Sequence, residues 1–230
     1  MGSQTQGTPA ATPALHAAVR WVPFKDSYWF ARVVFYRYLH ASEQQPWNPD
    51  YAYSFGYEDW HPGAWSATYS NYTGTRWNPD ALLRPSRLNF PQGLLATTYR
   101  FALPESMRSV FLAGDGDEAI CTAGAELTPR YMDLASLTER GNRVAATLGC
   151  RYTRPDGWFA GVVAFVYPRR FQQQPWDPDF TYSFGLLNVR PGTWSVWYSN
   201  YSGNRFPGRS RAAAEGTPRS GIVTVSWRFD

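Results

Sequence analysis

Charge is scarce in this sequence, and the shortage excludes a class of partner. Charged residues make up 17% of the 230 residues, below the roughly 25% usual for soluble domains. Of the 22 basic residues, only Lys25 is a lysine. No run of arginines forms the basic stripe typical of nucleic-acid-binding proteins. With a net charge of only +4, we expect no nucleic-acid partner.

Cysteine is equally scarce. Cys121 and Cys150 are the only two, too few for a disulfide scaffold and without the spacing of a metal site. They form one bridge if their strands are neighbours; otherwise they are two small buried apolar side chains. Gly-rich phosphate loops, nucleotide fingerprints and Cys/His metal patterns are also missing. We therefore expect no cofactor.

Long hydrophobic runs are missing as well. No segment approaches the roughly 18 consecutive apolar residues of a membrane helix, and no signal peptide is present. Residues 1–13 begin Met1-Gly2-Ser3 and are rich in Gln, Thr, Pro and Ala. We interpret them as a disordered tag or mature N-terminus from which a targeting sequence has been removed.

What the sequence has in abundance is aromatic residues, at 17%, and an internal repeat. Gln44 to Arg76 returns as Gln173 to Arg205, at an offset of 173 − 44 = 129. Further along, Gly93 to Phe101 matches Gly221 to Phe229 at an offset of 221 − 93 = 128. We predict one domain over 14–230 that contains repeat 1 (about 14–101), connecting strands (102–142) and repeat 2 (about 143–230).

Large apolar residues alternate with small or polar ones along both repeats, which predicts β-strands. Tyr51, Tyr53, Phe55 and Tyr57, for example, are separated by small residues. We predict about twelve strands, at 14–24, 27–39, 51–59, 63–72, 93–103, 107–113, 118–128, 143–153, 157–168, 180–187, 193–201 and 221–229. The outer face of a soluble sandwich carries many charges, whereas Ser, Thr, Gly and Ala fit the inside of a narrow barrel whose aromatic face meets lipid.

The connections favour the same architecture. Short turns alternate with longer loops at 40–50, 73–92, 169–179 and 202–220, as in outer-membrane barrels. Two connections depart from this rule: Gly114 to Asp117 is short for an outer loop, and Thr128 to Asn142 is long for an inner turn.

The chain end resembles a known family. Val223, Val225, Trp227 and Phe229 alternate up to a near-terminal aromatic residue, similar to the C-terminal strand signal of bacterial outer-membrane β-barrel proteins, although Asp230 follows where that family ends in Phe. Strand number and length also resemble the small porins for acidic oligosaccharides, at the level of architecture alone. The resemblance implies an all-β fold, a single antiparallel transmembrane β-barrel in the bacterial outer membrane, with the lipid bilayer as a partner.

A loop motif, W-[ND]-P-D, provides the first candidate site. It occurs at Trp47–Asp50, Trp77–Asp80 and Trp176–Asp179. Asn or Asp before Pro starts a turn, so one interpretation is a rigid loop. The other is an aromatic platform beside a carboxylate, with Trp47 and Asp50 or Trp176 and Asp179 binding a sugar ring or Ca²⁺.

Charged residues on the small-residue face provide the second candidate site. In the predicted strand frame they are Arg20, Arg100, Arg151, Arg228, Glu58 and Glu126. A charge inside a barrel must be paired or hydrated. These residues therefore either form an Arg–Glu network that fills a closed barrel or line a pore that favours anions.

Three functions fit these features. The first is an outer-membrane barrel that passes or binds a saccharide or another small anionic solute. The second is a secreted, soluble, lectin-like protein that binds glycan. The third is an outer-membrane enzyme acting on lipid, for which His40, Ser42 and Glu43 are the candidates, although proximity in sequence does not establish a triad. Neither the oligomeric state nor the solute follows from the sequence.

Overall fold

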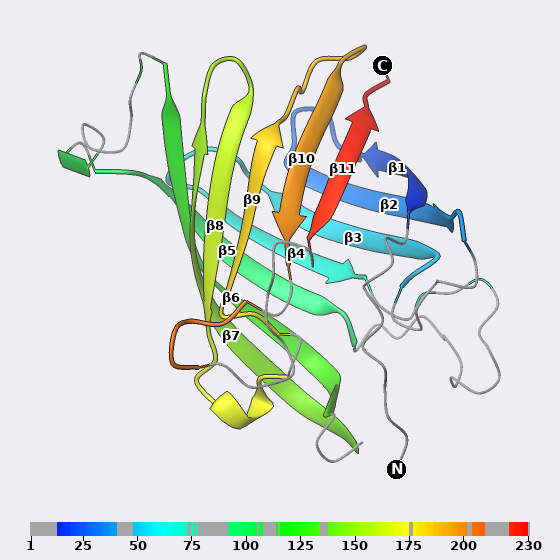
Figure 1. Ribbon diagram of the computed structural model, residues 1–230, viewed down its shortest axis with the longest axis vertical. Coiled ribbons are helices and arrows are strands. Elements are labelled where there is room, and N and C mark those ends of the chain that lie inside the picture. The colour runs from blue at the N-terminus through cyan, green and yellow to red at the C-terminus, as the bar shows by residue number, and fades with distance from the viewer. Residues whose placement is uncertain are drawn as a thin grey trace.

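The described residues fold into one antiparallel sheet, which confirms the all-β part of the predicted fold class. In a computed structural model, the described residues are 13–40, 48–72, 75, 77, 92–104, 106–107, 114, 116–133, 138–174, 177–201, 204–209 and 221–229. The sheet is strongly coiled, so that β8 to β11 are roughly vertical in Figure 1 while β2 to β4 lie across it.

Within these residues the structure has eleven strands. They are β1 (Ala14–Trp21), β2 (Trp29–Tyr38), β3 (Tyr51–Glu58), β4 (Trp65–Asn71), β5 (Leu94–Ala102), β6 (Glu118–Asp133), β7 (Thr138–Thr153), β8 (Trp158–Val166), β9 (Phe180–Leu186), β10 (Trp194–Asn200) and β11 (Ile222–Trp227). A 3₁₀ helix, η3 (Arg170–Gln172), lies between β8 and β9. Each strand pairs antiparallel with the next in sequence order.

The prediction of a closed barrel is not met. The sheet ends at β1 on one edge and at β11 on the other, and no pairing joins these two strands. Because neighbouring strands alternate in direction, β1 and β11 run the same way. Any closure between them therefore requires a parallel pair.

The strand predicted at 107–113 does not enter the sheet between its neighbours. β5 pairs directly with β6 in antiparallel register, with Leu95 opposite Leu127 and Phe101 opposite Cys121. An intervening strand would have separated β5 from β6 and made them parallel. Residues 108–113 themselves lie outside the described residues.

The long connection predicted at 128–142 is also wrong. β6 and β7 continue pairing past Thr128 and Arg143 as far as Asp133 and Thr138, so most of this stretch is strand. The alternation of apolar residues by which the strands were predicted breaks at Pro129. Backbone pairing continues past it because β6 and β7 keep the same register.

Because one strand, β6, separates the two repeats, equivalent strands of the repeats run in the same direction. β1 to β5 belong to repeat 1, β7 to β11 to repeat 2, and β6 lies between them. The odd-numbered strands all finish at one end of the sheet, which we call the turn end, where 22–28, 59–64, 154–157 and 187–193 form connections. The opposite end, the loop end, carries 39–50, 72–93, 167–179 and 201–221.

The same contacts recur in both repeats at the offset of 129. The Asp50 N–H donates to the Thr75 carbonyl at 2.7 Å, and the Asp179 N–H donates to the Asn204 carbonyl at 2.7 Å. Gly56 and Gly185 hold φ of 149° and 152°, and a Cβ at Gly56 would lie 2.3 Å from the Ala67 carbonyl oxygen. Glycine is required there because the two backbones approach too closely for a side chain.

Pairing registers divide the strands into two faces. One, the apolar face, carries the large residues: Trp29 lies opposite Tyr57 and Phe55 opposite Tyr69. Many of its side chains are exposed, including Trp21 (64%) and Trp65 (62%). The other, the small-residue face, contains buried residues such as Ser66 and Phe159. The sheet therefore curls around its small-residue face and leaves its apolar face outward.

Aromatic residues gather at both margins of the apolar face. At the turn end they are Trp21, Trp29, Tyr57, Trp65, Tyr99, Tyr152, Trp158, Trp194 and Trp227. Near the loop end they are Phe35, Tyr51, Tyr53, Phe180 and Tyr182, with Tyr69 and Tyr198 one level further in, opposite Phe55 and Phe184. The levels between them hold mainly Ala, Val and Leu, with Phe55 and Phe184.

Candidate functional site

Three of the predicted charged residues meet at the turn end, on the small-residue face. Arg20, in β1, donates from Nη1 to Glu58 Oε2 at 3.1 Å. Arg100, in β5, reaches the other oxygen of Glu58 at 4.0 Å and donates to Ser66 Oγ at 3.0 Å. Arg100 also donates to the Asp59 carbonyl. Glu58 therefore partly neutralises both arginines of repeat 1.

The arginines of repeat 2 have different surroundings. The Arg151 guanidinium lies 4.1 Å from the centre of the Phe159 ring. Arg228 is exposed, and its carbonyl accepts the Gly192 N–H at 2.9 Å. Within the described residues, neither Arg151 nor Arg228 has a carboxylate at ion-pairing distance.

A pocket of about 450 Å³ opens beside Arg100 and Arg151, which both line it. Trp60, His61, Pro62, Glu118, Ile120, Thr122 and Thr153 complete its wall. The Arg100 guanidinium stacks on Trp60 at 4.4 Å. Glu118 was not among the predicted site residues, although it opens the strand predicted at 118–128 and lies eight residues (126 − 118 = 8) before Glu126, which the alternation puts on the same face. Sequence reasoning also missed Trp60 and His61, which lie in a turn where no alternation applies.

The Asp59 carboxylate stabilises the turn between β3 and β4 through hydrogen bonds to His61. The Asp59 Oδ1 accepts the His61 backbone N–H at 3.0 Å and lies 2.8 Å from the imidazole Nδ1. The backbone N–H of His61, and then its ring, lower the pKa of Asp59 although partial burial would raise it. Tyr28 contacts the same ring nitrogen at 3.3 Å.

The W-[ND]-P-D aspartates fasten loops at the other end of the sheet. Asp50 Oδ2 accepts the Trp77 N–H at 2.9 Å, and Asp179 Oδ2 accepts the Phe206 N–H at 2.9 Å. Each hydrogen bond joins two loops, the one before β3 to the one after β4 and the one before β9 to the one after β10. These aspartates therefore have a structural role at the loop end. Trp47 and Trp176 lie outside the described residues, so the sugar-platform interpretation stays a prediction.

Asp179 is the most enclosed of these carboxylates. Burial on its own would raise the pKa of Asp179, but hydrogen bonds from the Gln173 side chain and the Phe206 N–H, with Arg205 and Arg209 nearby, hold it below its ordinary value. Arg205 Nη1 lies 3.6 Å and Arg209 Nη1 3.5 Å from Oδ1.

Glu126 lies near the loop end, away from the other predicted charges. It pairs in the sheet with Ala145, two residues from the Thr128–Arg143 pair. Arg143 binds Asp177 Oδ2 at 2.5 Å and so ties the loop after β8 to the wall of the sheet. Burial raises the pKa of Asp177 more than Arg143 lowers it.

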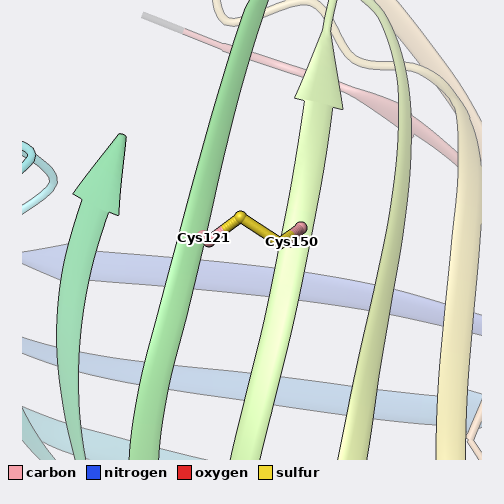
Figure 2. Close-up of a disulfide and its surroundings, with 2 residues drawn as sticks. All are labelled: Cys121 and Cys150. Atoms are coloured by element: carbon pink, nitrogen blue, oxygen red, sulfur yellow. A yellow bond between two sulfur atoms is a disulfide. The ribbon is translucent and has the colours of Figure 1, made fainter. Parts of the chain in front are cut away.

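The two cysteines form a disulfide. Cys121 and Cys150 are cross-strand neighbours on β6 and β7, and their sulfurs are bonded (Figure 2). Of the two interpretations left open by the sequence, the bridge is the one found. It lies on the apolar face, opposite Phe101 and Val162.

Signals for other chemistries are weak. Among the described residues, no group of three or more His, Cys, Asp or Glu side chains is placed to hold a metal ion. His40 follows β2, whereas Ser42 and Glu43 lie outside the described residues. Within the part of the chain that the structure describes, no helix is long and apolar enough to span a membrane.

Comparison with known proteins adds no relative: the chain matches no family model, no curated protein and no solved structure.

Proposed function

We propose that this chain is an outer-membrane β-barrel protein whose interior passes or binds a small anionic solute, including acidic saccharides. One observation carries the proposal: most exposed large apolar side chains of the strands lie on one face of the sheet and point outward. The opposite face carries mainly small or polar residues, with exceptions such as Phe30, Phe159 and Trp197. Soluble monomers rarely expose an apolar surface this extensive. A lipid environment would cover it.

The margins of the apolar face support the same proposal. Transmembrane barrels place girdles of aromatic residues at both membrane interfaces, around an apolar band. The Trp-rich margin at the turn end and the Tyr-rich margin near the loop end match that arrangement. Arg37 lies on the apolar face near the loop end of β2. In a membrane, an arginine side chain at this level is long enough to extend its charged group to the membrane–water interface.

Two further features agree with an envelope location. Disulfides persist in oxidising compartments such as the bacterial periplasm and cell surface, and Cys121 is bonded to Cys150. Long loops gather at one end and shorter connections mainly at the other, as in outer-membrane barrels. The connection 103–117 between β5 and β6 is the exception.

Closure in the membrane is part of the proposal. Unpaired strand edges are too costly in hydrocarbon, so only closed sheets span a bilayer. We propose that β1 and β11 pair in the membrane, in parallel because these two strands run the same way. The small-residue face then becomes the lumen, with Arg20, Arg100 and Arg151 near its turn end.

The first test is behaviour in detergent. The protein should need detergent to stay in solution, and the folded form should migrate differently from the boiled form on a gel. Planar bilayers then test passage, where the parent should conduct with a preference for anions. Folded, monodisperse protein in plain buffer would instead favour the soluble lectin-like alternative, and a silent bilayer would leave a barrel that binds without conducting.

A further inference from the structure

The two repeats differ at one position that controls the charge of the turn end. Position 58 in repeat 1 is Glu58, and its equivalent, 58 + 129 = 187, is Leu187. Glu58 binds Arg20 at 3.1 Å. The equivalent arginine of repeat 2, 20 + 131 = 151 by sheet position, is Arg151, which precedes the turn into β8 as Arg20 precedes the turn into β2.

Backbone and ring contacts around the two arginines are otherwise alike. The Glu58 N–H donates to the Tyr28 carbonyl at 2.9 Å, and the Leu187 N–H donates to the Gly157 carbonyl at 3.0 Å. The Arg20 guanidinium lies 4.3 Å from the Phe30 ring, and that of Arg151 lies 4.1 Å from the Phe159 ring. The carboxylate of Glu58, which Leu187 replaces in repeat 2, is therefore the main difference between the surroundings of Arg20 and Arg151.

This difference leaves Arg151 without an ion-paired carboxylate at the pocket. Arg100 lines the same pocket but is engaged by Glu58, Ser66 and the Asp59 carbonyl. Glu118 also lines it, yet it forms no ion pair with either arginine. Arg151 is exposed at the wall of the pocket, so its guanidinium is accessible to an anion that supplies the counter-charge.

We propose that Arg151 is the anion-binding group of this pocket, and that its ligand is a small organic molecule carrying a single carboxylate. The inference rests on the proposed function, because it places the anion site inside the barrel. A guanidinium matches the two oxygens of a carboxylate in a bidentate fork. An arginine that has no ion-paired carboxylate and lies in the same pocket as Glu118 suits a ligand with one negative charge better than a phosphate with two. The pocket volume of about 450 Å³ is within the range of small-molecule sites.

The repeat supplies its own controls. Arg151→Ala removes the proposed group. Arg20→Ala removes the equivalent arginine, which does not line the pocket. Leu187→Glu restores in repeat 2 the acid that repeat 1 has, without touching either arginine. If Arg151→Ala fails to fold, Leu187→Glu still tests the same idea.

The experiment is calorimetric titration of the folded protein in detergent with benzoate, benzyl alcohol as its neutral counterpart, and inorganic phosphate. We expect benzoate to bind the parent more tightly than either of the others. Arg151→Ala and Leu187→Glu should each weaken benzoate binding about tenfold or more, and Arg20→Ala should have a much smaller effect. Equal losses for Arg151→Ala and Arg20→Ala, or unchanged binding in Leu187→Glu, would overturn the proposal. Preferential binding of phosphate would assign the pocket to a different anion and overturn the carboxylate.

Binding in detergent does not depend on conductance, so the two proposals fail separately. A protein that conducts anions but shows no Arg151-dependent binding keeps its proposed function and loses this site. A protein that binds benzoate in this pattern but carries no current keeps the site and loses the passage of solute.

Discussion

Replacing Phe55 with arginine should strongly destabilise the protein in a bilayer. Phe55 lies on the apolar face, 40% exposed, between the two aromatic margins and opposite Ala31 and Tyr69. An arginine on the lipid face costs about 2–4 kcal/mol near the midplane of a membrane. On a water-exposed surface, a comparable substitution typically changes stability by no more than about 0.5 kcal/mol.

The substitution also removes a ring contact, which a second variant measures separately. The Phe55 and Tyr69 rings are 5.1 Å apart, and such pairs contribute about 0.5–1.5 kcal/mol. Phe55→Leu loses this contact but stays apolar. The free energy of unfolding is measured by urea titration in lipid vesicles for the parent, Phe55→Leu and Phe55→Arg. The equivalent change in repeat 2, Phe184→Arg, should have a similar effect. If Phe55→Arg is no worse than Phe55→Leu, the apolar face does not meet lipid.

Three other changes test separate parts of the structure. Cys121→Ser should lower the free energy of unfolding by about 2–4 kcal/mol, measured by urea titration, and an unchanged value would argue that the bridge does not form in the protein. Parallel closure is tested by introducing cysteines at Val19 and Val225, and at neighbouring positions to cover other registers, in a protein that also carries Cys121→Ser and Cys150→Ser. One such pair should cross-link β1 to β11 in vesicles; no cross-link at any register would contradict parallel closure. Because the pKa of Asp179 is held below its ordinary value of 3.8, its contribution to stability is full above that pH and is lost as the pH falls through the folded pKa. Asp179→Asn should abolish this acid-dependent loss, measured as the unfolding midpoint against pH; an identical profile in parent and variant would exclude the role assigned to Asp179.

The repeat made most of the strands predictable. Alternation along Tyr51 to Tyr57 and its counterpart in repeat 2 located strands because side chains of a strand alternate between two faces. The same rule separated the apolar face from the small-residue face. It did not predict that β5 pairs directly with β6, because strand pairing depends on partners that alternation does not specify.

Which charged side chains contact one another across strands could not be predicted, for a related reason. That Glu58 joins both Arg20 and Arg100, while Glu126 lies near the loop end, follows from pairing register. Register is set by contacts among several strands, and a one-residue shift moves every side chain to the other face. The sequence alignment of the repeats already contained the Glu58 and Leu187 difference, but its consequence for Arg151 emerged only when both positions were placed in the sheet.

The central claim is that the exposed tryptophans of the apolar face contact lipid chains, and fluorescence quenching tests it most directly. The parent protein is reconstituted in vesicles of lipids brominated along the acyl chain, with unbrominated vesicles as the reference. Because Trp21, Trp65 and Trp194 are 64%, 62% and 58% exposed on that face, the emission should be strongly quenched by the brominated lipids, most by those brominated near the headgroup end of the chain. Equal emission in both kinds of vesicle, from protein that is folded, would contradict the membrane account.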